Sequence, residues 1–481
     1  MKQFIGGRWV AAGGGREFDD LDPWSGAVLD RVPAGDAHDA RLAIEAAHAA
    51  FAGWKNTAPG VRQEIFLRAA DILRRRRDEV MSWLAAETGC GYAFGSIQLD
   101  FVISLLRQAS GAAYAAIGQV IPSDEPDAFA MALRHPVGVV AAIAPWNAAL
   151  VLSCRAVAAP LALGNTVVLK PSEESPWAGG LVWAEIFTEA GLPPGVLNVV
   201  THARGEAGVI GQELVAHPWV RRLNFTGSTV TGRRLAEAAG RHLKRMVLEL
   251  GGQNPLIILA DADVDYAVDA AAYGSFLHQG QICMCARRIF VERPIAARFL
   301  EQFAAKTAAL PYGDPKDSAT VVGPLINDYA LRTVERRVGE AVASGARVLA
   351  GGSARGPCYP ATLVVDVPPS CELARLETFG PVVMADIVDG PEEALQLANQ
   401  SHYGLTAGVL TGDPERGLAL ANRLEAGIVH VNDQPIRDEP QMPFGGVKDS
   451  GWGRFGVGFA MEEFTEMRWV TLAGQRRSFP F

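Results

Sequence analysis

The stretch 137–170, VGVVAAIAPWNAALVLSCRAVAAPLALGNTVVLK, decides how the chain folds. Its two short apolar runs, 137–143 and 166–169, have the length of buried strands and contain many β-branched residues. The segment between them, 150–163, has the length and composition of a buried helix. A strand, a helix and a second strand in this order are typical of a parallel sheet with helices packed on its faces.

This alternation of strands and helices continues to residue 250. The further predicted elements are a helix over 176–190, a strand over 196–200, a helix ending at 215, a strand over 221–225, a helix over 229–240 and a strand over 246–250. Five short strands separated by helices predict an α/β fold with a parallel sheet of the nucleotide-binding type. Ligands bind such sheets beyond the carboxyl ends of the strands, so the residues after each strand are the first candidates for a site.

Other regular segments flank this predicted sheet. Helical periodicity precedes it over 36–51, 59–87 and 92–117. A second α/β pattern follows it, with a strand over 256–259, a helix over 264–278 and a strand over 288–291. Residues 468–472 are strand-like, and we expect them to pair with 131–135 as a small separate unit. A length of 481 residues exceeds the size at which one hydrophobic core stops growing, so two or three domains are expected.

The composition argues against several classes of protein. The net charge of −9 is spread along the chain, which argues against a nucleic acid or an anionic membrane as partner. No apolar run reaches the roughly 18 residues that a membrane span needs, and the first residues lack the apolar core of a signal peptide. The six cysteines form no disulfide-like framework, so a cytoplasmic location is expected.

Cys283 is the candidate nucleophile. It lies in the run 278–287, HQGQICMCAR, directly after an apolar helical pattern. A thiolate attacks carbonyl carbon well, although a cysteine after a helix is by itself more often an inert core residue. Cys285 could line the same pocket, protect Cys283 through a reversible disulfide, or form half of a metal site. No second Cys/His cluster with ligand spacing occurs, which argues against a metal.

Polar motifs follow several of the predicted strands. Asn147 comes after the strand 137–143 and could stabilise developing negative charge. Glu249 lies in the last strand, where partial burial would raise its pKa toward that of a general base. Each motif also has an ordinary explanation as a turn, a helix cap or a solvated loop. The other polar candidates are Lys170, Ser172 and Glu173 after the second strand, Gly227 and Ser228 before the helix 229–240, and Gly251 after the last strand.

The joint order of these motifs is more informative than any one of them. Together with 377–381 (ETFGP), 399–405 and 443–451 (PFGGVKDSG), they resemble the motifs of the NAD(P)-dependent aldehyde dehydrogenase superfamily. The resemblance covers nearly the whole chain, in family order and at similar spacing. It implies an enzyme that oxidises an aldehyde to a carboxylic acid. It also implies a Rossmann-type cofactor domain, an α/β catalytic domain and a small β element for oligomerisation.

The resemblance assigns roles to individual residues. Cys283 would add to the aldehyde carbon, Asn147 with the Cys283 backbone N–H would bind the oxyanion, and Glu249 would activate the water that hydrolyses the thioester. Glu249 favours this hydrolysis over transfer of the acyl group to coenzyme A. Glu173 at the adenosine ribose would repel a 2′-phosphate and favour NAD, although Lys170 beside it could tolerate NADP. The expected cofactor contacts are Trp146, Lys170, Ser172, Glu173, Gly227, Ser228, Gly251, Glu377 and Phe379.

Two runs, 280–284 (GQICM) and 432–446, look like the benzaldehyde, vanillin and salicylaldehyde dehydrogenase branch. The small side chains of Ala148 and Ala149 leave width for a planar ring. Arg155, further along the same helix, could contact a polar ring substituent or could lie in a structural salt bridge. The expected substrate contacts are Leu152, Arg155, Met284, Cys285 and Phe444. An aliphatic aldehyde or semialdehyde dehydrogenase with the same mechanism is the alternative, and an inactive binding protein is disfavoured by the intact motifs.

These implications divide the chain into three units. Residues 1–117 and 138–250 would form the NAD(P)-binding domain, and 251–460 the catalytic domain with the nucleophile. Residues 118–137 and 461–481 would form the oligomerisation element. The expected partners are a small aldehyde and further copies of the chain, in a homodimer or a homotetramer.

Overall fold

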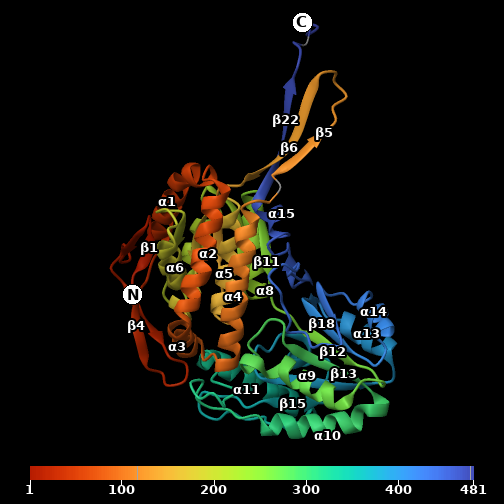
Figure 1. Ribbon diagram of the computed structural model, residues 1–481. Helices are drawn as coiled ribbons and strands as arrows, with labels where there is room; N and C mark the ends of the chain where they lie inside the picture. The colour runs from red at the N-terminus through yellow and green to blue at the C-terminus, as the bar shows by residue number, and fades with distance from the viewer. Residues whose placement is uncertain (116, 477) are drawn as a thin grey trace.

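A computed structural model of the chain describes residues 1–115, 117–476 and 478–481 (Figure 1). Its first sheet contains the five predicted strands, so the predicted α/β fold class is confirmed. Neighbouring strands among the five are parallel, in the spatial order β9-β8-β7-β10-β11. They are β7 (Val139–Ile143), β8 (Thr166–Lys170), β9 (Leu197–Val199), β10 (Val220–Thr226) and β11 (Arg245–Glu249).

The order in which the chain adds strands to the sheet reverses at β7. The chain runs from β7 to β8 and β9 on one side and then crosses to β10 and β11 on the other. Connections that leave the carboxyl ends of β7 and β10 therefore turn toward opposite faces, which opens a crevice between them. The sheet is extended by the antiparallel strands β1 (Gln3–Ile5), β2 (Arg8–Val10) and β21 (Gly451–Trp452).

Both faces of this sheet are buried, which explains the uninterrupted apolar runs of its strands. Along β7, Val140 and Ala142 face one hydrophobic cluster, whereas Val139, Ala141 and Ile143 face another. The first face is covered by α2 (Pro59–Arg75), α3 (Arg77–Thr88), α4 (Tyr92–Ala112), α5 (Ala149–Ala162), a π-helical turn (Trp177–Leu181) and α6 (Val182–Ala190). The second face is covered by α1 (Ala37–Lys55), α7 (Ala207–Ala216) and α8 (Thr229–Arg241).

A second, mostly parallel sheet follows in the chain, in the order β14-β15-β16-β13-β12-β18-β19. Its strands are β12 (Asn254–Ile258), β13 (Ala286–Glu292), β14 (Arg347–Ala350), β15 (Thr362–Val365), β16 (Val382–Val388), β18 (Thr406–Leu410) and β19 (Ile428–Val431). Its helices are α9 (Val264–Phe276), α10 (Arg293–Ala309), α11 (Asp328–Ala343), α12 (Glu372–Arg375), α13 (Pro391–Asn399) and α14 (Pro414–Ala421). The connection from α9 to β13 carries Cys283.

A three-stranded antiparallel sheet projects from the body of the molecule (Figure 1). It consists of β5 (Gly118–Ile121), β6 (Ala128–Pro136) and β22 (Thr465–Ala473), the last preceded by α15 (Ala460–Phe464). The predicted pairing of 131–135 with the C-terminal strand is confirmed, with Met131 opposite Val470. The small strands are β3 (Glu17–Leu21), β4 (Val28–Pro33), β17 (Tyr403–Gly404) and β20 (Val447–Lys448).

Three predicted helices differ from the observed ones. The predicted helix 59–87 is two helices, because Arg76 leaves the helical region and pairs with Glu79 and Glu185. The predicted helix 264–278 ends at Phe276, since His278 and the residue after it have positive φ angles. The predicted helix 92–117 ends at Ala112, and residue 116 lies outside the described residues.

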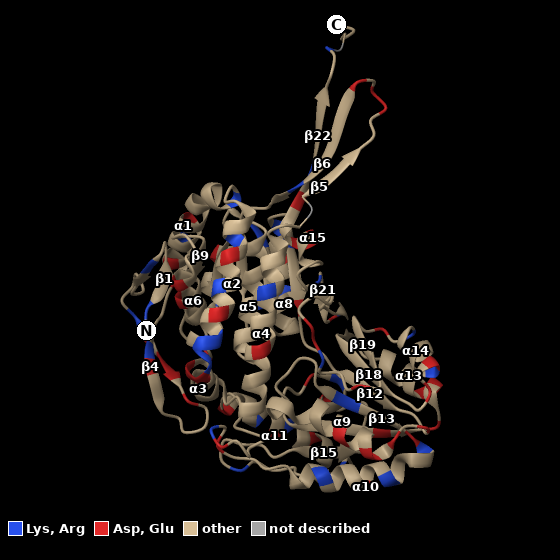
Figure 2. Ribbon diagram, in the orientation of Figure 1, with Lys and Arg blue, Asp and Glu red and all other residues tan. Residues whose placement is uncertain are grey.

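Charged residues of both signs are scattered over the helices and loops rather than gathered by sign (Figure 2). Within the part of the chain that the structure describes, every helix is too short or too polar to cross a membrane.

Candidate active site

A cleft of about 390 Å³ lies at the carboxyl ends of β7, β10 and β11. It brings together Asn147, Glu249 and Cys283, which are far apart in the sequence, and Cys283 as a residue is partly exposed. The cleft is also lined by the predicted cofactor residues Trp146, Gly227, Ser228, Gly251, Glu377 and Phe379. Its size is that of a typical small-molecule or cofactor site.

The backbone before Cys283 is sharply bent. His278 and Gln279 have φ angles of 50° and 54°, and Gly280 follows at 66°. A Cβ atom at Gly280 would lie 2.2 Å from the carbonyl oxygen of Gly380, so only glycine fits there. This turn ends the preceding helix and directs the next residues back toward the cleft.

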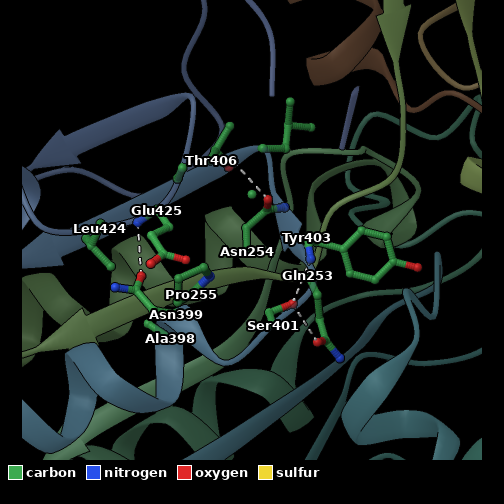
Figure 3. Close-up of a pocket in the computed structure, with 13 residues that line it drawn as sticks. Gln253, Asn254, Pro255, Ala398, Asn399, Ser401, Tyr403, Thr406, Leu424 and Glu425 are labelled. Carbon is green, nitrogen blue, oxygen red and sulfur yellow. Dashed lines mark hydrogen bonds between the residues drawn. The ribbon is translucent and has the colours of Figure 1, made fainter. Parts of the chain in front are cut away.

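Asn254, at the start of β12, holds the nucleophile segment in place. Its Nδ2 donates to the carbonyl oxygens of Cys283 and Cys285, at 2.7 Å and 2.9 Å. Its Oδ1 accepts from the backbone N–H of Thr406 at 3.1 Å, a bond drawn in Figure 3. Asn254 therefore connects the Cys283 loop to Thr406, the first residue of β18. Sequence reasoning missed this residue, although a polar side chain opening an apolar strand was a usable signal.

We expect Asn254→Ala to lower kcat by about tenfold and the thermal unfolding midpoint by about 5 °C, because two carbonyls and one N–H lose a buried partner. The affinity for NAD should change little. The matched control is Asn56→Ala, since Asn56 is exposed at the end of α1, where its side-chain amide donates to the carbonyl oxygen of Ala52. Thermal unfolding and steady-state kinetics measure both effects, and unchanged kcat with an unchanged midpoint would contradict this role.

Both reactive groups have raised pKa values. Burial raises the pKa of the Cys283 thiol, and the nearby Glu377, Glu249 and Cys285 raise it further. Burial also raises the pKa of Glu249 well above its ordinary value, against the opposing effects of Arg155 and Arg454. Glu249 is 3% exposed, and neither carboxylate oxygen has a hydrogen-bond partner among the described residues. The carboxylate of such a group, once formed, is a stronger base than that of an exposed glutamate.

Glycines make room for both carboxylates of the cleft. A Cβ atom at Gly445 would lie 2.7 Å from Oε1 of Glu249, and one at Gly251 would lie 2.2 Å from Oε2 of Glu377. The Glu377 carboxylate accepts from the backbone N–H of Gly252 at 3.2 Å. Burial raises the pKa of Glu377 to about 7, although Arg287, this N–H and a second arginine oppose the effect.

The remaining lining residues fit a dinucleotide. Ser228 caps α8 by accepting from the N–H of Thr231 at 3.3 Å, so the positive end of the helix dipole faces the cleft. Phe379 has a φ angle of 52° and meets the ring of Trp146 edge-on, with centroids 5.6 Å apart. An aromatic edge, a helix N-terminus and a recessed carboxylate together can hold an aromatic ring, a phosphate and a sugar hydroxyl.

Lys170, Ser172 and Glu173 do not line this cleft but lie at the carboxyl end of β8, next to it in the sheet. The Lys170 carbonyl accepts from the N–H of Ala144, in the loop that carries Trp146 and Asn147. Lys170 Nζ lies 2.6 Å from Nε2 of His202, a residue that sequence reasoning did not select. The only sequence signal was a histidine directly after a strand.

Four of the five predicted substrate residues belong to the large hydrophobic core on the first face of the sheet, and none of the five lines the cleft. Leu152, Met284, Cys285 and Phe444 belong to the same hydrophobic cluster, and Cys283 packs against it. Arg155 is ion-paired with Asp438, and its guanidinium lies 4.1 Å from the Phe444 ring centroid. Of the two interpretations of Arg155, the salt bridge is therefore the one present, and the contact with a ring substituent stays a prediction.

All six cysteines are free, and Cys285 is fully buried. The protective disulfide between Cys283 and Cys285 thus stays a prediction as well. In the described ranges no group of three or more His, Cys, Asp or Glu side chains could hold a metal ion.

Comparison with known proteins adds independent information. The profile described as the aldehyde dehydrogenase family matches residues 9–470. Vanillin dehydrogenase of Pseudomonas fluorescens is 45% identical over 99% of this chain and 98% of its own length. Benzaldehyde dehydrogenase [NAD(+)] of Pseudomonas putida is 42% identical over 98% of this chain and 96% of its own. The fold also matches a crystal structure of salicylaldehyde dehydrogenase from Pseudomonas putida G7, complexed with salicylaldehyde, with a TM-score of 0.97. The two chains are 37% identical, and the match covers 100% of this chain and 99% of the salicylaldehyde dehydrogenase chain.

Proposed function

The chain belongs to the aldehyde dehydrogenase family, and on that premise we propose that it oxidises aromatic aldehydes to carboxylic acids with NAD. Relatives similar over nearly the whole chain are named for vanillin and benzaldehyde. The observation that carries the proposal is the packing of Cys283 against the large hydrophobic core, to which Leu152, Met284 and Phe444 belong. Apolar side chains of this kind suit an uncharged ring, and burial of such a ring is favourable.

A semialdehyde that carries a second carboxylate is the competing class of substrate. Such a substrate needs an unpaired cation close to the nucleophile. Arg155, a cation packed on the Phe444 ring, is 5% exposed and is already neutralised by Asp438. Turning Arg155 toward a substrate carboxylate would leave Asp438 buried without its partner, which costs several kcal/mol, about 3 to 5. The ion pair therefore argues against Arg155 as the group that binds a substrate carboxylate.

The first half of the reaction forms a covalent bond to Cys283. The sulfur adds to the aldehyde carbon, and the carbonyl oxygen becomes an oxyanion. The side-chain amide of Asn147 and the backbone N–H of Cys283 donate hydrogen bonds to it. The raised pKa of the thiol means that the thiolate is a minor species, but a minor thiolate fraction suffices because the thiolate is a strong nucleophile.

The second half releases the acid. NAD(P), when bound, supplies the acceptor for the hydride that leaves the former aldehyde carbon. The carbon is then held to Cys283 as a thioester. Glu249 takes a proton from water, the resulting hydroxide adds to the thioester carbon, and the C–S bond breaks to release the carboxylic acid. A carboxylate with a raised pKa, whose two oxygens have no partner in the part of the chain that the structure describes, suits this task.

NAD is proposed over NADP because of Glu173. Burial raises the pKa of Glu173, whereas its own backbone N–H, the charge of Lys170 and the Ser172 hydroxyl lower it. A carboxylate at this place can accept from ribose hydroxyls and repels a 2′-phosphate. The name of the similar benzaldehyde dehydrogenase, which specifies NAD(+), supports the same preference.

Glu377 makes cofactor binding depend on pH. The group is proposed to accept a hydrogen bond from the nicotinamide ribose, which requires the carboxylate. With a pKa of about 7, its charged fraction falls from about nine-tenths near pH 8 to about one-tenth near pH 6. We therefore expect the Kd for NAD to rise by about tenfold over this range, and Glu377→Gln to bind NAD weakly with no such dependence. Fluorescence titration measures this, and an equal pH slope in the variant would contradict it.

The projecting sheet is proposed to join copies of the chain into a homodimer or a homotetramer. Large apolar side chains are exposed along it, among them Trp469 at 82% and Val120 at 66%. An exposed apolar ribbon of this kind is an aggregation hazard unless a second copy covers it. The free cysteines also fit the proposed cytoplasmic location.

A substrate panel tests the proposed function. Benzaldehyde, vanillin and salicylaldehyde should be oxidised with kcat/KM at least about tenfold above hexanal and above a carboxylate-bearing semialdehyde, a difference of about 1.4 kcal/mol in transition-state binding. Each aldehyde is tested with NAD and with NADP, and NADH formation is followed by absorbance. A semialdehyde as the best substrate would overturn the aromatic assignment while leaving the reaction type intact.

A further inference from the structure

A buried polar cluster lies at the carboxyl ends of β8 and β9, outside the cleft that contains Cys283. Its members are Lys170, Glu173 and His202, and the side chain of His202 is fully buried. Nδ1 of His202 lies 3.0 Å from the carbonyl oxygen of Ala203, and Nε2 lies 2.6 Å from Nζ of Lys170. A carbonyl oxygen only accepts, so Nδ1 carries the proton and Nε2 accepts from the ammonium of Lys170.

The neighbours of His202 keep the ring in this neutral form. Burial and the charge of Lys170 lower the pKa of His202 to about 4, against the opposing effect of Glu173. Glu173 is the nearest anion, with Oε2 3.8 Å from Nε2. At neutral pH the ring therefore serves as a hydrogen-bond acceptor and not as a second cation.

This arrangement determines which donors of Lys170 are free. An ammonium has three N–H groups. One is donated to the carbonyl of Pro171 at 3.0 Å and one to His202, so one N–H remains for a ligand. Lys170 is only 5% exposed, and its long side chain would otherwise have several rotamers to choose from. His202 thus selects one orientation of the ammonium beside the Glu173 carboxylate.

We propose that His202 is a positioning residue for the dinucleotide: it orients Lys170 so that the remaining N–H, together with the Glu173 carboxylate, binds the two hydroxyls of the adenosine ribose. The donor of Lys170 and the acceptor of Glu173 match a vicinal diol, in which each hydroxyl both donates and accepts. This inference rests on the proposed use of NAD.

Two variants of His202 test whether its hydrogen bond to Lys170 matters, or only the volume of its side chain. His202→Leu keeps an apolar volume but has no acceptor for Lys170. His202→Gln keeps an acceptor oxygen that can reach Nζ. The matched control is His242→Leu, because His242 is exposed at the end of α8. Thermal unfolding shows whether each variant is folded.

We expect His202→Leu to raise the Kd and the KM for NAD by about tenfold, the scale of one hydrogen bond to a charged group. The kcat should stay within about twofold of the wild type, and the KM for benzaldehyde should not change. His202→Gln should restore NAD binding to within about threefold, and His242→Leu should behave as the wild type.

Two results would overturn the inference: an unchanged Kd for NAD in a folded His202→Leu variant, or equal losses in the leucine and glutamine variants. The Kd is measured by fluorescence titration without any aldehyde. If the wild type binds NAD but oxidises no aromatic aldehyde, the proposed substrate class fails while the test of His202 still stands.

Discussion

Cys283→Ser is expected to lower kcat/KM for benzaldehyde by about 10⁴-fold or more, the scale on which enzymes lose activity when the nucleophile is removed. Serine keeps the shape of the side chain. Its hydroxyl ionises far less readily than a thiol, and the buried environment that already raises the pKa of Cys283 would disfavour an alkoxide still more. Hydride cannot leave the aldehyde carbon until the covalent adduct has formed.

Cys285→Ser is the matched control for this prediction. Cys285 is fully buried and does not line the cleft, so its replacement should keep kcat/KM within about tenfold of the wild type. NAD titration and thermal unfolding would show that both variants remain folded. If Cys283→Ser keeps more than one-hundredth of the wild-type kcat/KM, the nucleophile is a different group. The same conclusion follows if Cys285→Ser loses activity by about 10⁴-fold and Cys283→Ser does not.

The parallel sheet was predictable because its strands are buried on both faces. Such strands appear in the sequence as short uninterrupted apolar runs, and β7 and β8 follow that pattern. The break between α2 and α3 was not predictable, since the apolar periodicity continues across it. Arg76 ends the first helix and pairs with Glu185, a residue 109 positions away that no local pattern could connect to it.

The candidate site was predictable to the extent that its residues follow strands or precede helices. Asn147, Glu249 and Cys283 were selected from the order of motifs, and one cleft brings them together. The contacts that hold such residues in place were not predictable. Asn254 reaches across to the Cys283 carbonyl, and the partner of Arg155 is 283 positions further along the chain. Such pairs depend on how separate elements pack, not on spacing in the sequence.

Glu249→Gln should separate the two halves of the reaction. Glutamine has nearly the same shape, but it cannot take a proton from water. Addition of the aldehyde to Cys283 and loss of hydride should continue, so a burst of about one NADH per active site is expected. Steady-state turnover should then fall by about 10³-fold, within the range that a positioned general base contributes.

The burst has a covalent counterpart that mass spectrometry can measure. A trapped thioester adds the mass of the aldehyde minus two hydrogens to the protein, and peptide mapping should place it on Cys283. The thioester should be absent from Cys283→Ser and short-lived in the wild type.

The pH profile of kcat gives a third readout. Because burial raises the pKa of Glu249, kcat of the wild type should rise with pH as the carboxylate forms, and the residual kcat of Glu249→Gln should not. A variant that shows neither a burst nor a thioester would place Glu249 before hydride loss, as the base that deprotonates Cys283. A variant with wild-type turnover would mean that water attacks the thioester without this carboxylate, and the two unpaired oxygens of Glu249 would then need another explanation.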